Sequence, residues 1–145
     1  MIIKAFEIDK ISLEKKNYFL FYGENSGFKN EVIKNKFKKI YKNKTYQYDE
    51  KEILSDKDNF FNSILSKSFF ENEKLIIISR ITEKVKHIIE EILDKNIDGI
   101  KIILSAGILE KKSKVRIFFE KDKNLVCTPF YADTSQTLNN IAFNF

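Results

Sequence analysis

The sequence predicts an α/β fold of three layers, with a parallel five-stranded sheet between two layers of helices. Short apolar segments alternate with segments of helical periodicity, which is the pattern of repeated strand–helix units joined by right-handed crossovers. Three of the apolar segments are almost continuous in Ile, Leu and Phe, as is typical of strands buried on both faces. The 145 residues include only one proline and four glycines, so we expect one compact unit rather than domains on a linker.

The expected strands follow from the apolar runs and their flanking turn residues. They are Tyr18–Tyr22, Thr45–Tyr48, Leu75–Ser79, Ile100–Leu104 and Leu125–Thr128.

Amphipathic helices are expected between these strands. Their apolar stripes are Phe28, Val32, Ile33, Phe37, Ile40 and Tyr41, then Phe61, Ile64 and Leu65, then Val85, Ile88, Ile89, Ile92 and Leu93, and finally Val115, Phe118 and Phe119. Ser55 with Asp58 predicts a helix start of the capping-box type. Another helix is expected to open at Thr82, with Glu83 in its first turn.

The last residues begin a new amphipathic pattern that is not completed. The tail TSQTLNNIAFNF contains apolar residues with no further chain to pack on. We therefore expect one domain over residues 1–132 and, over 133–145, the start of a truncated second domain.

Composition limits the classes of function. Cys127 is the single cysteine, so we expect a buried thiol and no disulfides. The chain has no signal-peptide-like start and no run long enough to span a membrane, which predicts a cytoplasmic protein without a membrane partner. The net charge of +5 admits a nucleic-acid-binding module. However, the lysines are scattered among asparagines and isoleucines, and only Arg80 and Arg116 are arginines, which favours a solvated surface.

The stretch YGENSGFKN follows the first expected strand and resembles a phosphate-binding loop. The functional motif is G-x-x-x-x-G-K-[ST], in which glycines admit phosphates, lysine pairs with them and the hydroxyl holds magnesium. Gly23, Gly27 and Lys29 keep the loop's outline, but Phe28 occupies the close-approach glycine position and Asn30 the hydroxyl position. The expected strand before Arg80 also ends without the carboxylate that such enzymes use for magnesium. We expect a degenerate loop that binds neither nucleotide nor metal.

No other catalytic constellation is apparent. His87 is the sole histidine, lies off the apolar stripe of its helix, and has no cysteine or second histidine for a metal site. We therefore expect a binding protein without a catalytic residue, metal or cofactor.

Two adjacent phenylalanines, Phe69 and Phe70, lie in the expected connection before the strand Leu75–Ser79. Neighbours on a helix point about 100° apart, so the two rings can hardly enter the same core position. In one interpretation Phe69 continues the buried face of Phe61 and Leu65, and Phe70 packs beneath the strand. In the other, the pair is an exposed anchor for a partner's hydrophobic pocket.

Three segments, FLFYGENSGFKNE, SKSFFENEKLIII and ILEKKSKVRIFFEKDKNLVCTPFYAD, occur in this order between Phe19 and Asp133. Together they resemble the N-terminal domain of the delta subunits of bacterial DNA polymerase III clamp loaders. The resemblance implies an AAA+-like module that binds no ATP and belongs to a polymerase holoenzyme without being catalytic itself. In that family a hydrophobic pair after a helix, usually Leu-Phe, binds the ring-shaped sliding clamp, and Phe69 and Phe70 fall at that position.

The resemblance thus implies a clamp-binding and clamp-opening function. The expected contact residues are Ser66, Lys67, Ser68, Phe69, Phe70, Glu71 and Asn72. The partners would be the clamp's beta subunit and, through C-terminal domains that this sequence lacks, other loader subunits, with DNA contacted only indirectly or weakly. The alternatives are a divergent P-loop NTPase or nucleotide kinase, and a basic nucleic-acid-binding module.

Overall fold

The computed structural model describes residues 1–10, 16–42, 44–70, 73–95, 97 and 99–131, and the side chains of residues 9, 10 and 66–70 lie outside this description. The segment 133–145, expected to begin a second domain, is among the residues not described. The elements in chain order are η1 (Ala5–Lys10), β1 (Tyr18–Tyr22), α1 (Ser26–Val32), η2 (Ile33–Lys38), β2 (Thr45–Asp49), α2 (Glu50–Ser55), α3 (Lys57–Phe70), β3 (Lys74–Ser79), α4 (Val85–Lys95), β4 (Ile100–Ser105), α5 (Lys114–Lys121) and β5 (Leu125–Pro129).

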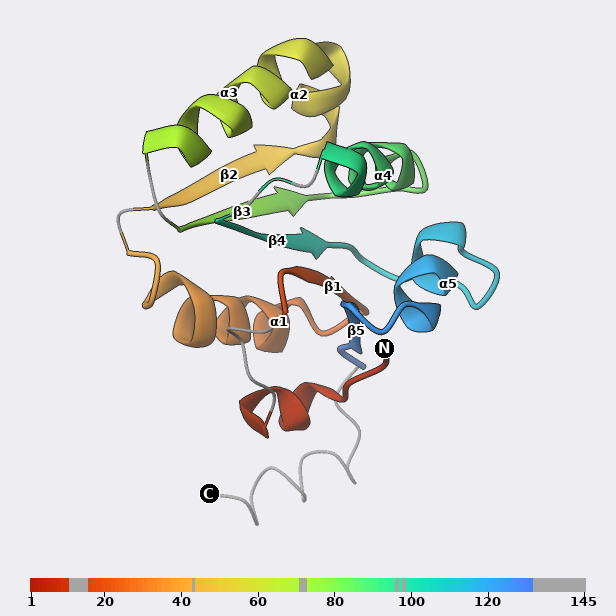
Figure 1. The fold of residues 1–145 in the computed structure, drawn as a ribbon. Coiled ribbons are helices and arrows are strands. Elements are labelled where there is room, and N and C mark those ends of the chain that lie inside the picture. Colours follow the sequence, from red (N-terminus) through yellow and green to blue (C-terminus); the bar gives the residue numbers. More distant parts are fainter. Residues whose placement is uncertain (11–15, 43, 71–72, 96, 98, 132–145) are drawn as a thin grey trace.

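The five strands form one sheet in the order β2-β3-β4-β1-β5, and every neighbouring pair is parallel (Figure 1). This confirms the predicted α/β class with a parallel five-stranded sheet, and each strand lies within one residue of its predicted bounds. β1, β3, β4 and β5 are almost wholly buried, whereas β2 at the edge is only partly covered. Burial on both faces explains why these strands are continuous in apolar residues.

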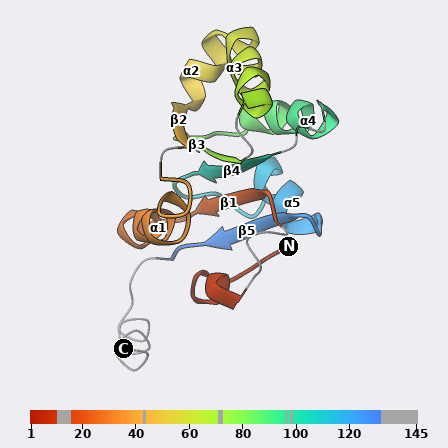
Figure 2. The same ribbon diagram turned by 60° about the vertical axis from the view of Figure 1, so that its left-hand side comes forward.

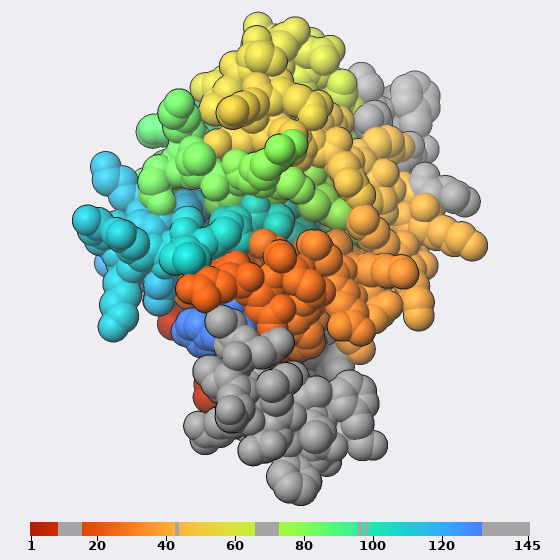
Figure 3. All heavy atoms as spheres, turned by 180° about the vertical axis from the view of Figure 1, so that it is seen from behind, coloured from red at the N-terminus to blue at the C-terminus, as the bar shows by residue number. Residues whose placement is uncertain are grey.

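Helices cover both faces of the sheet, as the prediction of three layers requires. The chain crosses from β1 to β2 in one direction and returns through β3 and β4 to β5 in the other. Because crossovers are right-handed, the two directions place helices on opposite faces. Figure 2 shows α1 on one side of the sheet and α4 and α5 on the other, and Figure 3 shows the surface of α1 and η2 in orange.

Each face has its own apolar core. On the α1 side, Val32, Ile33, Phe37 and Tyr41 pack with side chains that include Phe19, Phe21, Leu75, Ile77, Ile103 and Val126. On the other side, α3, α4 and α5 pack on side chains that include Leu20, Ile76, Ile78, Ile102, Leu104 and Cys127. The alternation along each strand therefore divides its residues between two cores.

Two helix starts differ from their predicted residues. α2 ends at Ser55, whose hydroxyl donates to the carbonyl of Glu52, and the side chain of Asp56 accepts from the amide of Asn59 to cap α3. α4 begins at Val85 rather than Thr82. The hydroxyl of Thr82 accepts from the amide of Lys84 (3.3 Å), as an N-terminal cap does. The amide and hydroxyl of Thr82 also donate to the buried carboxylate of Glu50 (3.0 and 2.8 Å), so this residue joins the turn before α4 to α2.

The single helix expected after β1 is divided in the structure. α1 continues directly into η2, which is a π-helix with backbone hydrogen bonds between residues i and i+5. η2 ends at Lys38, and Ile40, predicted to join the apolar stripe, lies in the following turn with 63% of its surface exposed.

Among the described helices, none has the length and apolar character needed to cross a lipid bilayer.

Candidate functional site

The loop after β1 lies where a parallel sheet of this order binds ligands. The connections that leave the neighbouring strands β1 and β4 run to opposite faces, through α1 and α5. The carboxyl ends of two such strands form a crevice, which is the usual ligand site of open α/β sheets. Gly23–Asn30, the predicted degenerate phosphate loop, occupies this crevice.

Gly23 is required by contact with the protein's own backbone. Its φ is +124°, a conformation that favours glycine. Its amide donates to the carbonyl of Gly107 (2.9 Å), which follows β4. A methyl group at Gly23 would lie 2.1 Å from the carbonyl oxygen of Phe130, after β5. The glycine thus allows the loop to meet the ends of both strands that flank β1.

Several loop amides are also paired within the chain. Asn25 donates to the carbonyl of Phe130 (3.1 Å) and Ser26 to that of Glu24 (2.9 Å). The side-chain oxygen of Asn25 accepts from the amide of Phe28 (3.1 Å), so Asn25 caps α1. A phosphate at a helix start binds amides that have no intrahelical partner. Here the amide of Phe28 already has a protein acceptor.

Lys29 points back into the protein. It is 6% exposed, and its ammonium donates to the carbonyl of Ala106 (2.7 Å), between β4 and Gly107. Burial lowers the pKa of this ammonium. The residue that would pair with phosphates in a functional loop therefore joins α1 to the end of β4.

Aromatic packing fills the position of the second close-approach glycine. The ring of Phe28 is half-buried and lies edge-to-face on the ring of Phe130, with centroids 5.4 Å apart. Phe130 in turn packs against Phe21 of β1 at 5.4 Å. Gly27 and Asn30, the other positions of the motif, are exposed on α1. The crevice is thus lined by an aromatic contact where a phosphate would lie.

Carboxylates do not gather at this edge of the sheet. The strands that flank β1 continue into Ala106 and Phe130, and β3 continues into Arg80. Arg80 has a left-handed φ of 53° and pairs with Asp49 at the end of β2. Within the described residues, no group of three or more His, Cys, Asp or Glu side chains could hold a metal ion. His87 is exposed, and burial raises the pKa of Cys127 to about 12.

The structure describes the predicted clamp-contact segment, residues 66–72, only in part. Its backbone over residues 66–70 is the last part of α3, so Phe69 and Phe70 end a helix rather than lying in a connection. The side chains of Ser66, Lys67, Ser68, Phe69 and Phe70 lie outside the described part of the structure, as do the whole of Glu71 and Asn72. Both interpretations of the phenylalanine pair therefore remain open.

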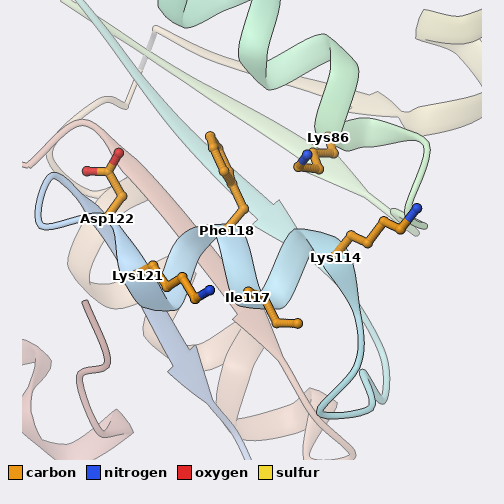
Figure 4. A pocket seen from close by; sticks show the side chains of 6 residues that line it. All are labelled: Lys86, Lys114, Ile117, Phe118, Lys121 and Asp122. Carbon is orange, nitrogen blue, oxygen red and sulfur yellow. The ribbon is translucent and has the colours of Figure 1, made fainter.

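A depression of about 480 Å³ lies over α4 and α5, away from the loop (Figure 4). It is lined by Lys86, Lys114, Ile117, Phe118, Lys121 and Asp122. The ammonium of Lys86 lies 5.6 Å above the Phe118 ring, a cation–π contact. The lining combines three cations and one carboxylate with the apolar side chains of Ile117 and Phe118.

The residues that close the crevice are not evident from the sequence. Ala106 and Gly107 act through their backbone carbonyls, and carbonyls leave no signal in side-chain chemistry.

Comparison with known proteins adds no assignment. No protein-family model matches this chain, and no curated protein is significantly similar to it.

Proposed function

We propose that this chain is the non-catalytic clamp-binding module of a bacterial replicative clamp loader, with an AAA+-like fold and a degenerate phosphate loop. Phe69 and Phe70 are the proposed anchor for the sliding clamp, and Ser66, Lys67, Ser68, Glu71 and Asn72 are the proposed flanking contacts. The starting point is the resemblance of three ordered segments to clamp-loader delta subunits. The observation that carries the proposal is the hydrogen bond from Lys29 to the carbonyl of Ala106. In a functional phosphate loop this lysine would pair with the nucleotide, but here it already donates to the protein.

The course of α3 also supports this proposal. The helix runs without a break to Phe70, and three residues separate it from β3. Helices that follow parallel strands run back along the sheet, so α3 ends at the edge where the strands begin. This edge is opposite the crevice. A partner that binds the end of α3 would therefore not compete with the closed loop.

Hydrophobic contact provides the affinity in this mechanism. Burying two phenylalanine side chains contributes roughly 1.5–3 kcal/mol each, from which the ordering costs of association are subtracted. A ligand that binds the open form of a ring more tightly than the closed form shifts the ring toward opening. The chain would in this way favour clamp opening without hydrolysing ATP.

The test is calorimetric titration of the sliding clamp from the same organism with this chain. We expect binding that falls at least about tenfold in Phe69→Ala and in Phe70→Ala, because each loses roughly 1.5 kcal/mol or more of apolar contact. Leu65→Ala is the matched control, since Leu65 is an exposed apolar residue of the same helix. Thermal unfolding of all three variants separates lost contact from lost folding.

Three outcomes would contradict the proposal. Absence of binding by the parent chain would contradict the function, and binding unchanged in both phenylalanine variants would contradict the site. Weaker binding by the phenylalanine variants together with lowered unfolding temperatures, while Leu65→Ala keeps both its binding and its unfolding temperature, would indicate that the phenylalanines belong to the core. A parallel titration with ATP and magnesium tests the enzyme alternative, because tight nucleotide binding would favour a divergent NTPase or nucleotide kinase.

A further inference from the structure

The positive charge of this chain is concentrated in one segment. Six lysines, Lys34, Lys36, Lys38, Lys39, Lys42 and Lys44, occur within eleven residues, and no acidic residue lies between Glu31 and Asp49. Without these six, the 26 basic residues become 20, against 21 acidic ones, which is a balance of −1. The excess charge of +5 is therefore local and not a property of the whole surface, contrary to the expectation of scattered lysines.

The fold turns these lysines outward. Val32, Ile33, Phe37 and Tyr41 bury the opposite side of the same segment against the sheet. Lys34, Lys39, Lys42 and Lys44 are exposed, and Lys36 and Lys38 are half-buried. The lysines lie on η2 and the turn that follows it, on the face whose surface is orange in Figure 3.

Five of these six lysines have no carboxylate partner among the described residues. In the described part of the structure, the ammonium groups of Lys34, Lys38, Lys39, Lys42 and Lys44 form no ion pair. The face of the sheet is covered here by α1 and η2, whereas the ion pairs Lys86–Glu90 and Arg116–Glu120 lie on the helices of the other face. Several such cations on one face attract a polyanion.

We propose that the lysines of η2 and the turn after it bind the phosphate backbone of duplex DNA. They are Lys34, Lys36, Lys38, Lys39, Lys42 and Lys44. Duplex DNA carries one phosphate charge per about 1.7 Å of its axis, so several of these ammonium groups can each meet a phosphate. Lysine suits phosphate as a point charge, whereas base readout relies on bidentate side chains such as arginine. Both arginines lie elsewhere and are paired with carboxylates. The contact is therefore not sequence-specific.

The aromatic and apolar residues of the segment favour a duplex over other polyanions. Single strands are bound by exposed aromatic rings on which bases stack, but Phe37 and Tyr41 are buried. An interfacial membrane helix needs a free apolar face. Here that face already packs on the sheet, and Ile40 is the exposed large apolar residue of the segment. This surface is distinct from the end of α3, and the inference does not depend on the proposed clamp contact.

The test is fluorescence anisotropy of a labelled 20-base-pair duplex, titrated with the chain at several salt concentrations. One variant replaces Lys34, Lys38, Lys39 and Lys42 with glutamine. The matched control replaces Lys84, Lys111, Lys114 and Lys121, four exposed lysines outside the segment, and has the same net charge. Each lost phosphate contact reduces the slope of log K against log salt by about 0.9.

We expect the segment variant to bind duplex at least about tenfold more weakly than the parent at low salt, with a slope shallower by about three. The control should stay within about twofold of the parent. Equal losses in both variants, or none in either, would overturn the inference. So would tighter binding of a single strand of equal length, or binding of phosphatidylserine vesicles without binding of duplex.

A second measurement needs no variant. Duplex should protect Lys34–Lys44 of the parent chain from an amine-acetylating reagent, as read by mass spectrometry, while Lys111 and Lys114 remain reactive. Uniform or absent protection would contradict the site even if the segment variant failed to fold. Clamp binding retained by the lysine variant would show that the two surfaces act separately, and its loss would not bear on duplex binding by the parent.

Discussion

The ammonium of Lys29 lies 2.7 Å from the carbonyl oxygen of Ala106, and this contact closes the crevice between β1 and β4. It joins the first helix after β1 to the end of the neighbouring strand. The side chain that a nucleotide-binding loop would direct to phosphate thereby becomes a structural link.

Replacing Lys29 should destabilise the protein in a manner that depends on pH. In Lys29→Met the Ala106 carbonyl loses its charged donor, and we expect a loss of about 1–2 kcal/mol at pH 7. Burial lowers the pKa of Lys29 from its ordinary 10.5. Between the lowered pKa and 10.5 the unfolded chain binds more protons than the folded one, so the parent gains stability as pH rises.

Urea unfolding of the parent and Lys29→Met at pH 7, 8.5 and 10 measures this difference. The gap between the two proteins should widen with pH, because the variant lacks the titrating amine while the other basic groups are common to both. A gap that narrows, or a variant as stable as the parent throughout, would show that Lys29 is not held as the structure describes.

The glycines of the crevice should differ sharply in their tolerance of a methyl group. Gly23→Ala combines a φ of +124° with a carbon 2.1 Å from the Phe130 carbonyl oxygen, and we expect a loss of about 3 kcal/mol or more. Gly107→Ala is the matched control, since a methyl there meets nothing within 4 Å, and its effect should stay within about 0.5 kcal/mol.

Gly27→Ala extends the comparison to the helix. The nearest atom to the added methyl is the Asn25 side-chain oxygen, at 3.9 Å. Alanine is favoured over glycine within a helix, so this variant should be about 0.4–1 kcal/mol more stable than the parent. Thermal and urea unfolding of the three variants check the order Gly27→Ala, Gly107→Ala, Gly23→Ala, from the most stable to the least. Similar losses at Gly23 and Gly107 would contradict the described loop.

The sheet could be predicted from the sequence because its signal is local. Strands β3 and β4 are buried on both faces, so their apolar character needs no knowledge of their neighbours. Helix starts were less predictable. The side chain of Thr82 accepts from the amide of Lys84 before α4, but it also donates to the carboxylate of Glu50, 32 residues away in sequence. Such a long-range contact is not visible in a window of sequence.

In the candidate site, too, side-chain types could be interpreted from the sequence, whereas long-range contacts could not. Phe28 and Asn30 led to the prediction of a degenerate loop, which stays a prediction. The partners that occupy the crevice could not be predicted in this way. Ala106, Gly107 and Phe130 contribute backbone carbonyls, and their proximity depends on the strand order around β1.

The carboxylate of Glu83 connects the turn before α4 to the start of α5. Glu83 lies before α4, yet it accepts from the hydroxyl of Ser113 and from the amides of Lys114 (2.7 Å) and Val115 (3.1 Å) at the start of α5. Burial on its own raises the pKa of Glu83, but the hydrogen bonds from Ser113, Val115 and Lys114 outweigh it, so the pKa is lower than the usual 4.5. The charged form is thus favoured by folding.

Glu83→Gln should therefore lower the free energy of unfolding by about 1 kcal/mol at neutral pH, since a charge at a helix start is replaced by a neutral amide. A carboxyl with a lowered folded pKa stabilises the protein above its unfolded pKa and loses this effect as pH falls through the folded value. The difference between parent and variant should hence shrink below pH 4.5. Glu91→Gln, an exposed site on α4 with the same change in charge, is the control. Urea unfolding at pH 7, 4.5 and 3 tests the prediction, which a difference independent of pH, or one equal to that of the control, would contradict.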